Sequence, residues 1–467
     1  MPIISRRSLL QSVALAPFVP AGEKPNVLFV VSDDQNSHLG CYGADVRSPN
    51  IDGLARVGTR FDRAYCQYPL CNPSRSSLLT GRRPLATKVL DNGTWFRDTL
   101  PNVVTLPQHF RQNGYWTATT GKVFHVDDDR AWDEGGDPPK RPPRPDQPPR
   151  RRPQTYDQHR NWLDGLSPQA LAAREREIDT WVALDGDGHD QPDYLTATRA
   201  IELLGQRPQD RPFFLAVGFV DPHAPFIAPK KYFDLYDPAK IKLPADFVPW
   251  PASKTLSYRP NADIFIKREA TPELARQAIA AYHAATSFMD AQLGRVLAAL
   301  DRLKLRQNTV IVFFGDNGFI LGQKGLWAKE SLFEEAARVP LIFSVPWIHP
   351  TGKMFPRPVE FLDIYPTLCD LCGLSLTEGL EGKSLAPLLK NPSAPWDEPA
   401  YTYMRWGDVI GRSVRTARYR YTEWDHGKLG AEMFDYQTDP GEMHDLASDP
   451  QYAATAAKLQ GLLAAIL

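Results

Sequence analysis

Two short stretches of this chain hold neighbouring residues that can bind a cation. Asp33 and Asp34 stand together in SDDQ, and Asp316 and Asn317 stand together in GDNG. Three carboxylates and an amide oxygen are hard ligands, which suit Ca²⁺ or Mg²⁺ better than zinc. The alternative is that each acidic pair caps a following helix. Two such motifs in one chain favour a divalent cation site.

A cysteine at residue 71 opens the run CNPSR, at what looks like the start of a helix. A disulfide framework is not expected, because the five cysteines are an odd number and Cys369 and Cys372 have the helical spacing of buried thiols. A soft thiolate is a poor match to the oxygen ligands above. A thiol nucleophile and a site of covalent modification therefore remain the open explanations for Cys71.

The cation-binding candidates follow short apolar runs that predict buried strands. Residues 26–31 (NVLFVV) stop at the first acidic pair, and residues 309–314 (TVIVFF) stop at the second. Helical patterns lie between them at residues 105–112, 193–204 and 272–300. Strands that alternate with helices predict an α/β fold with a largely parallel sheet. Because ligands bind beyond the carboxyl ends of such strands, we expect the two acidic pairs to converge.

Composition excludes some classes of protein. A length of 467 residues allows one large α/β domain and a smaller one. The formal net charge of −1 argues against nucleic-acid binding. Beyond the N-terminus, no apolar stretch approaches the roughly 20 residues that span a bilayer, so no membrane span is expected.

The ends of the chain differ in texture from its middle. Residues 1–21 combine SRRSLLQ with a short apolar run, which is typical of a twin-arginine export signal and favours a periplasmic or extracellular location. We expect a catalytic domain over residues 23–395, with an irregular Pro/Arg-rich insertion near 137–153. Residues 396–467 predict a small α+β subdomain with short antiparallel strands and a closing helix.

The run CxPSRxxxLTG that begins at Cys71 resembles the type I sulfatase family, in which this cysteine is oxidised to Cα-formylglycine by a formylglycine-generating enzyme. The resemblance covers essentially the whole mature chain and is closest to the iduronate-2-sulfatase-like branch. It implies an alkaline-phosphatase-like sandwich, with a large mixed, mostly parallel sheet between helices and a small C-terminal antiparallel sheet. The further matching motifs are SDDQ, TGKVFH, DPHAPF, FFGDNG and GLWAKESLFEEAARVPLIF.

The modification has a chemical rationale. A formylglycine aldehyde at residue 71 adds water to give a geminal diol, and one hydroxyl, acidified by the cation, can attack sulfur. The second hydroxyl lets the covalent sulfate intermediate collapse to the aldehyde without a second attack at sulfur. A serine could perform the first step but lacks this exit. The cation implied by the resemblance is calcium, with magnesium as the alternative.

The resemblance also implies roles for residues at matching positions. Lys122 and Lys329 would neutralise the sulfate oxygens, and Arg75 would anchor residue 71. His125 would take a proton from the second hydroxyl, and His223, with Lys329, would protonate the leaving alcohol. The implied cation ligands are Asp33, Asp34, Asp316, Asn317 and an oxygen of modified Cys71.

We therefore expect a sulfatase that hydrolyses a sulfate ester on a carbohydrate, such as a sulfated uronic acid or a polysaccharide fragment. Aromatic residues stack on sugars and arginines clamp carboxylates, which makes several loop residues substrate candidates. A phosphonate or phosphodiester hydrolase of the same superfamily is the enzyme alternative. A non-catalytic glycan-binding protein is disfavoured because no motif position is lost. The substrate candidates are Trp95, Arg97, Phe319, Trp327 and Arg405.

Overall fold

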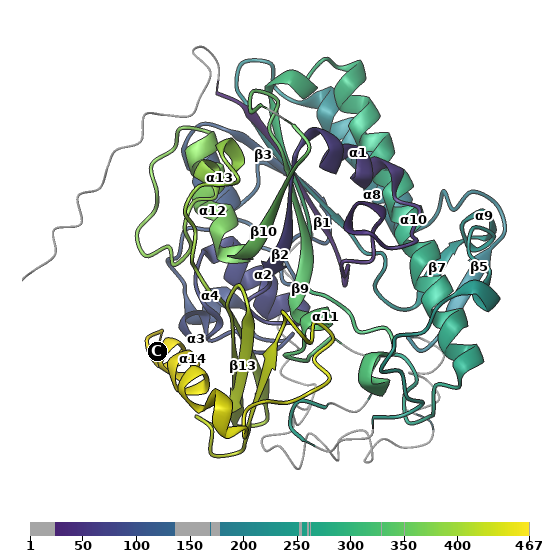
Figure 1. Cartoon of the computed structure of the whole chain (residues 1–467). Coiled ribbons are helices and arrows are strands. Elements are labelled where there is room, and N and C mark those ends of the chain that lie inside the picture. The colour runs from purple at the N-terminus through teal and green to yellow at the C-terminus, as the bar shows by residue number, and fades with distance from the viewer. Residues whose placement is uncertain are drawn as a thin grey trace, which may run out of the picture.

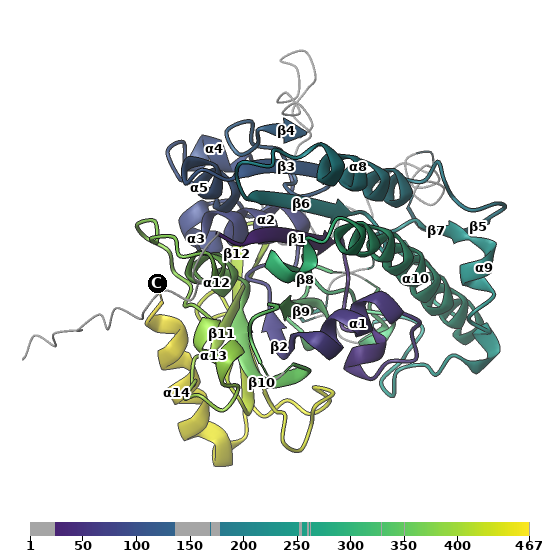
Figure 2. The same cartoon turned by 90° about the horizontal axis from the view of Figure 1, so that it is seen from above.

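The fold is known from a computed structural model, and its main body is one large sheet covered by helices. Eight strands form this sheet in the order β10-β2-β9-β8-β1-β6-β3-β4. Figure 2 looks along the sheet and shows helices on both of its faces. The export signal and the Pro/Arg-rich insertion expected from the sequence lie outside the described residues. The structure describes residues 24–135, 169, 178–251, 255–258, 261, 263–327, 329–349 and 351–466.

The centre of the sheet consists of three parallel strands. β1 (Asn26–Ser32) pairs with β8 (Thr309–Gly315) on one side and with β6 (Phe213–Phe219) on the other. Every residue of the three strands is buried, which explains why the sequence shows continuous apolar runs instead of alternation. Ser32 lies opposite Gly315, so the chain leaves both strands at the same point. The expected convergence of the two acidic pairs is confirmed.

The outer strands make the sheet mixed. β9 (Arg338–Ser344) runs antiparallel to β8 and to β2 (Thr59–Tyr65), while β10 (Lys353–Glu360) runs parallel to β2. On the other side, β3 (Trp116–Gly121) runs parallel to β6. The mostly parallel, mixed sheet expected from the sequence is therefore confirmed. The remaining short strands are β4 (Glu134–Gly135), β5 (Trp181–Leu184) and β7 (Phe226–Pro229).

Helices cover both faces of the sheet through two apolar cores. One face packs against α2, α5 and α12, and the other against α1, α8 and α10 (Figure 2). The side chain of Thr271 accepts a hydrogen bond from the Leu274 amide and caps the start of α10. The bounds are α1 Pro49–Val57, α2 Cys71–Thr80, α3 Pro84–Thr87, α4 Phe96–Thr99, α5 Leu106–Gln112, α8 Pro192–Gln206, α9 Lys230–Phe233, α10 Pro272–Arg302, α11 Glu334–Ala337, α12 Ile364–Leu371 and α13 Ala386–Lys390.

The C-terminal part forms a second, four-stranded antiparallel sheet, shown in yellow-green at the lower left of Figure 1. The closing helix α14 (Ala453–Ala464) packs against it. This arrangement confirms the short antiparallel sheet expected from the sequence. Among the described residues, no helix has both the length and the apolar character needed to cross a membrane. The strands are β11 Ala400–Trp406, β12 Val409–Arg415, β13 Tyr419–Trp424 and β14 Ala431–Asp435.

A buried network of charges joins the two sheets. Glu334 in α11 contacts Arg420 and Arg415 of the C-terminal sheet, and Nε of Arg420 lies 2.8 Å from Oε1 of Glu442. Arg420 also donates a hydrogen bond to the Leu332 carbonyl oxygen, at 3.1 Å. Burial alone would raise the pKa of Glu334, but the two guanidinium groups hold it well below its usual range. The network therefore depends on the negative charge of Glu334.

Replacing Glu334 with glutamine should lower the free energy of unfolding by about 3–5 kcal/mol, because the buried guanidinium groups lose their counter-charge. Urea unfolding of both proteins measures the difference. Glu202→Gln is the control, because Glu202 pairs with Arg199 at an exposed site where the change should stay within about 0.5 kcal/mol. Equal effects of the two substitutions would contradict a stabilising role for the network.

Candidate active site and cation site

Three carboxylates meet at the edge of the sheet where β1 and β8 end. Oxygens of Asp33, Asp34 and Asp316 lie within 4.8 Å of one another, and the three side chains are buried. The Asp34 amide donates to Oδ1 of Asp316 at 2.9 Å. Burial, together with repulsion from the other two carboxylates, raises the pKa of Asp316 to about 7 although Arg75 opposes the shift. A cation bound here would relieve that repulsion.

Asn317 supplies the amide oxygen that the sequence predicted. Its Nδ2 donates to Oδ1 of Asp34 at 2.8 Å, which fixes the orientation of the amide. Its Oδ1 is buried and has no hydrogen-bond partner within the described part of the chain. An orphaned buried oxygen next to three carboxylates is the donor set that Ca²⁺ and Mg²⁺ prefer, so the residues present fit such a cation.

Cys71 is the first residue of α2 and faces the same cluster. Its Sγ lies 3.2 Å from Oδ1 of Asp33 and 3.8 Å from Oδ1 of Asp34. All ten residues of α2 are buried. Burial and the Asp33 carboxylate raise the pKa of the Cys71 thiol well above its usual range. The unmodified thiol therefore stays protonated at neutral pH and is a weak nucleophile.

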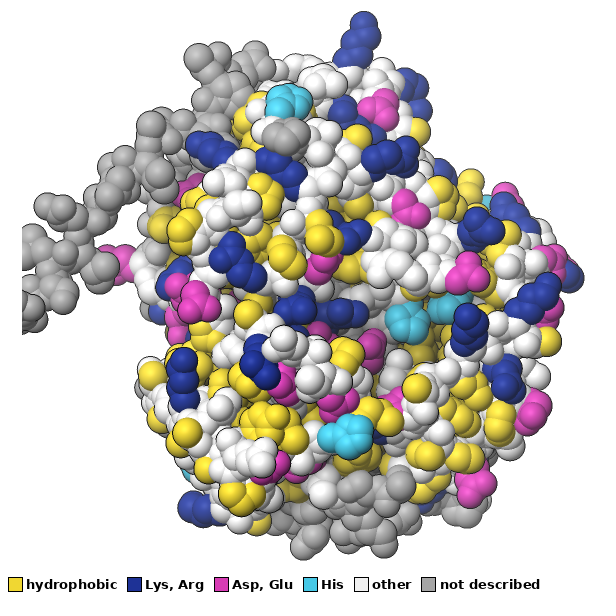
Figure 3. Space-filling model, in the orientation of Figure 1, with side chains coloured by type: hydrophobic (Ala, Val, Ile, Leu, Met, Phe, Trp, Pro, Cys, Tyr) yellow, Lys and Arg dark blue, Asp and Glu magenta, His cyan; other side chains and the backbone are white. Residues whose placement is uncertain are grey.

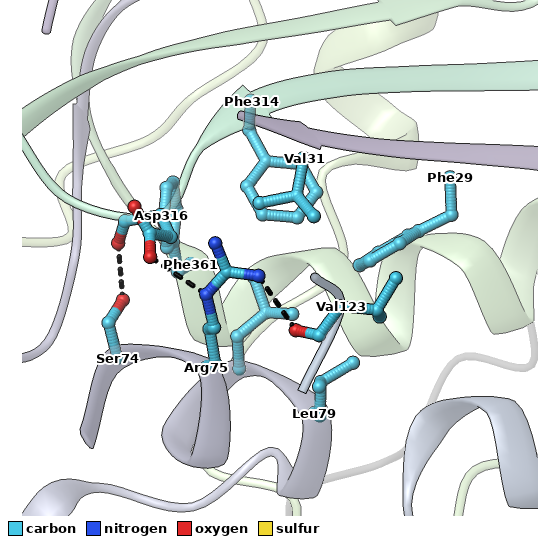
Figure 4. Close-up of a pocket in the computed structure, with 10 residues that line it drawn as sticks. Phe29, Val31, Ser74, Arg75, Leu79, Val123, Phe314, Asp316 and Phe361 are labelled. Carbon is cyan, nitrogen blue, oxygen red and sulfur yellow. Dashed lines mark hydrogen bonds and ion pairs between the residues drawn. The ribbon is translucent and has the colours of Figure 1, made fainter. Parts of the chain in front are cut away.

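Arg75 lies one helical turn after Cys71 and points at Asp316 (Figure 4). Its Nε lies 2.8 Å from Oδ2 of Asp316, and its Nη1 donates to the Val123 carbonyl oxygen at 2.9 Å. Ser74 donates to the Asp316 backbone oxygen at 2.5 Å. Behind the guanidinium, Figure 4 shows apolar side chains from β1 and β8, which exclude alternative polar partners. The start of α2 is thereby tied to the end of β8.

Two lysines complete the charge balance. Nζ of Lys329 lies 2.7 and 2.9 Å from the two oxygens of Asp34 and 3.5 Å from Sγ of Cys71. Lys122, which follows β3, pairs with Asp33. Its backbone packs so closely on Gly218 that a Cβ there would lie 2.0 Å from the Lys122 carbonyl oxygen. Figure 3 shows basic and histidine side chains around a hollow near the centre of this face.

Two histidines border the cluster from different sides. Nε2 of His223 lies 3.7 Å from Oδ2 of Asp34, and its Nδ1 lies 2.6 Å from the Ala224 carbonyl oxygen. With a proton on Nδ1, that nitrogen donates a hydrogen bond to the carbonyl, and Nε2 is the nitrogen that faces the acids. Burial, reinforced by Lys122 and Arg75, lowers the pKa of His125 to about 3. A neutral His125 is able to accept a proton.

The structure places three of the substrate candidates inside the protein. Phe319 and Trp327 are buried in an apolar cluster against α10, where they stabilise the fold. Arg97 is also buried and forms a 2.6 Å ion pair with Asp128. Their side-chain types suit sugar binding, but their contacts are already made inside the protein.

Trp95 and Arg405 remain at the border of the site. Trp95 is half-buried and packs on the edge of the apolar core. The Arg405 side chain is 35% exposed, and its Nη2 lies 3.3 Å from Oδ2 of Asp91. Asn72, next to Cys71, donates to the backbone oxygens of Asp91 at 2.8 Å and Thr94 at 2.7 Å. Arg405 is thus held close to the helix start that carries Cys71.

Sequence reasoning missed Asn72 and Asp91. Asp91 lies in DNGTWFRD, the stretch that supplied Trp95 and Arg97, and its Oδ1 accepts the amides of Gly93 and Thr94 at 2.8 Å. An acidic residue before Asn-Gly is a turn signal, which was available in the sequence. That the turn would border the site was not available, because it depends on contact with Asn72.

The chain has known relatives both in sequence and in fold. A family model described as "Sulfatase" matches residues 25–374, and one described as "N-sulphoglucosamine sulphohydrolase, C-terminal" matches residues 322–466. A sulfatase of Formosa agariphila is 33% identical, over 94% of this chain and 86% of the relative. Human iduronate 2-sulfatase is 32% identical, over 91% of this chain and 92% of its own. A phosphonate monoester hydrolase of Agrobacterium radiobacter shares the fold, with 24% identity, 95% coverage of both chains and a TM-score of 0.74.

One buried histidine outside the cluster gives a pH prediction. Burial, and then the neighbouring His38, lowers the pKa of His283 to about 3, below the value near 6.5 expected in the unfolded chain. As pH falls below 6.5, His283 binds a proton in the unfolded chain but stays neutral in the folded protein, so the free energy of unfolding decreases.

His283→Gln should therefore reduce the acid-induced loss of unfolding free energy by up to about 1.4 kcal/mol per pH unit between pH 6.5 and pH 4. Urea unfolding at several pH values measures the slope, which separates this effect from any offset at pH 7. Substitution of the exposed His349 by glutamine is the control. An unchanged slope for His283→Gln would contradict the prediction.

Proposed function

Because this chain belongs to the sulfatase family, we propose that it hydrolyses a sulfate monoester on a carbohydrate, with a modified residue 71 as nucleophile and a divalent cation beside it. Membership of the family makes the protein a sulfuric ester hydrolase. The carbohydrate, the modification and the cation are parts of the proposal.

The placement of Cys71 carries this proposal. Its side chain lies between the carboxylate of Asp33 and the ammonium group of Lys329, at 3.2 and 3.5 Å. A nucleophile at this position would have the metal-binding carboxylates on one side. On the other side it would have the Lys329 ammonium group, which could neutralise the sulfate oxygens. The raised pKa of the thiol disfavours a thiolate mechanism, which leaves covalent modification as the other explanation for Cys71 that the sequence offers.

The cation and the modification supply what the unmodified side chains lack. Ca²⁺, or Mg²⁺ as the alternative, would be held by Asp33, Asp34, Asp316 and Asn317 and would acidify a hydroxyl and neutralise sulfate charge. Formylglycine, made from Cys71 by a formylglycine-generating enzyme, would supply hydroxyls through its hydrate.

The remaining side chains bind, orient and move protons. Lys122 and Lys329 would bind the sulfate oxygens, and Arg75 would anchor residue 71. His125 is kept neutral by burial, so its imidazole would accept a proton from residue 71. In the doubly protonated ring, Nε2 of His223 would give its proton to the leaving alkoxide oxygen, while the Nδ1 proton stays hydrogen-bonded to the Ala224 carbonyl.

The proposed substrate is a sulfated uronic acid or a fragment of a polysaccharide that contains one. The similarity to iduronate 2-sulfatase and the exposed guanidinium of Arg405 support this choice. Trp95 would offer an aromatic face at the border of the site. We also propose that residues 1–21 direct export to the periplasm or the exterior, because they pair two arginines with a short apolar run.

The state of residue 71 provides the first test. In protein produced together with a formylglycine-generating enzyme, mass analysis should find formylglycine in the peptide that contains residue 71. Cys71→Ala should lower turnover of a sulfated sugar by about three orders of magnitude or more, because the nucleophile is lost. An unmodified thiol in protein that still turns over substrate would contradict the mechanism.

Two further measurements sharpen this test. Cys71→Ser should accumulate a sulfate ester on the serine, detectable by mass, because a serine ester has no second hydroxyl through which to release sulfate. Parallel assays on sulfate and phosphate esters of one alcohol distinguish a sulfatase from the phosphonate and phosphodiester hydrolases. Dominant phosphodiesterase activity would overturn the substrate class.

The proposed carboxylate contact gives a separate prediction. Arg405→Ala should raise KM about tenfold for a sulfated uronic acid, because a charge-assisted hydrogen bond is lost, and should leave KM for an uncharged aryl sulfate almost unchanged. Arg418→Ala is a matched control, since Arg418 is also an exposed arginine of the C-terminal part that pairs with an aspartate, Asp435. Equal effects of Arg405→Ala on the KM of both substrates would show that Arg405 does not bind the substrate carboxylate.

A further inference from the structure

Asp34 adopts an uncommon backbone conformation at the cation site. Its φ is +59°, in the left-handed region, where a residue with a side chain is strained. This turn comes directly after β1 and directs the carboxylate toward Asn317, whose Nδ2 is 2.8 Å away, and Lys329, whose Nζ is 2.7 Å away. The strained turn must be held by contacts elsewhere, because the carboxylate would otherwise swing away as the backbone relaxes.

Two of the hydrogen bonds that hold it come from one phenol group, in addition to the bond from the Asp34 amide to Oδ1 of Asp316. The Tyr282 hydroxyl donates to the Asp34 carbonyl oxygen at 2.7 Å and accepts from the Asn36 amide at 2.9 Å. The hydroxyl thus acts as a donor to one side of the turn and as an acceptor from the other. Asn36 also donates through its side chain to the Phe319 carbonyl oxygen at 2.9 Å, which ties the turn to the segment after β8.

The ring that carries this hydroxyl is itself fixed. Tyr282 is fully buried on the long helix α10. Its ring stacks on Phe319 at an interplanar angle of 22° and meets Phe226 edge-on. A rigid ring on a long helix gives the hydroxyl a fixed position.

We propose that Tyr282 is a positioning residue for the cation: its hydroxyl holds the left-handed turn at Asp34 and so aims the Asp34 carboxylate into the site. The inference rests on the cation of the proposed function, and the Tyr282 hydroxyl is engaged by the Asp34 carbonyl and the Asn36 amide rather than by a carboxylate. Loss of the hydroxyl leaves a buried carbonyl and a buried amide unpaired, and the turn relaxes.

The test is calcium titration of chelator-treated protein by isothermal titration calorimetry. Tyr282→Phe, which removes one oxygen and keeps the ring, should raise the calcium Kd about tenfold or more. Turnover of this variant should recover as calcium is raised, because the reacting groups are intact. A lost reacting group would not be rescued by the ion, and a general loss of stability is separated by the control variant below.

The chain offers a matched control in Tyr236. Its hydroxyl is also buried beside α10, accepts from the Arg47 amide at 2.8 Å and lies 2.6 Å from Oγ of Ser287, but it does not contact the cation site. Tyr236→Phe should lose similar stability in urea unfolding and keep the wild-type calcium Kd. Urea unfolding also verifies that both variants fold cooperatively.

The possible failures are distinguishable. Wild-type protein that binds neither calcium nor, in a parallel titration, magnesium would overturn the cation site, and the inference with it. Wild-type protein that binds calcium, with an unchanged Kd in Tyr282→Phe, would overturn the inference alone. Equal weakening in Tyr282→Phe and Tyr236→Phe would also overturn it, because the effect would then be a general loosening around α10.

Discussion

The crowding of three buried carboxylates at one edge of the sheet is the constraint on which the rest of the site depends. Asp33, Asp34 and Asp316 repel one another where little water can screen them. This repulsion is offset by Arg75 from α2 and by Lys122 and Lys329, which follow β3 and β8. Each of the three forms an ion pair with one of the carboxylates. A site assembled in this way holds its positive groups in place before any substrate arrives, which is the arrangement that stabilises developing negative charge.

The architecture explains how groups so far apart in sequence converge. Parallel strands deliver Asp33 and Asp316 to one edge, and the missing Cβ of Gly218 lets the chain that carries Lys122 approach β6. The C-terminal sheet helps to fix the segment that carries Lys329, because Arg420 donates a hydrogen bond to the carbonyl of Leu332, three residues after Lys329. Charge pairs in that network therefore connect the second sheet to the segment that carries Lys329, which pairs with Asp34.

The sequence predicted the features that are encoded locally. Strand-end acids at Asp33 and Asp316 and a helix start at Cys71 could be read from apolar runs and turn residues, and the structure agrees. Phe319 and Trp327 could not be classified, since an aromatic residue suits a sugar site and a core equally well and long-range packing decides between them. Tyr282 gave no signal, because its partner Asp34 lies 248 residues away and α10 shows only the ordinary pattern of a buried helix.

The complete burial of α2 has a consequence for maturation. Under the proposed mechanism, the helix start at Cys71 must be oxidised, yet in the folded protein this residue is only 1% exposed and lies within a continuous helix. Under this mechanism, the modifying enzyme would therefore have to act before the chain folds. Competition between oxidation and folding in the producing cell would then decide the active fraction of a preparation, and a chain that folds first would stay inactive unless it unfolds.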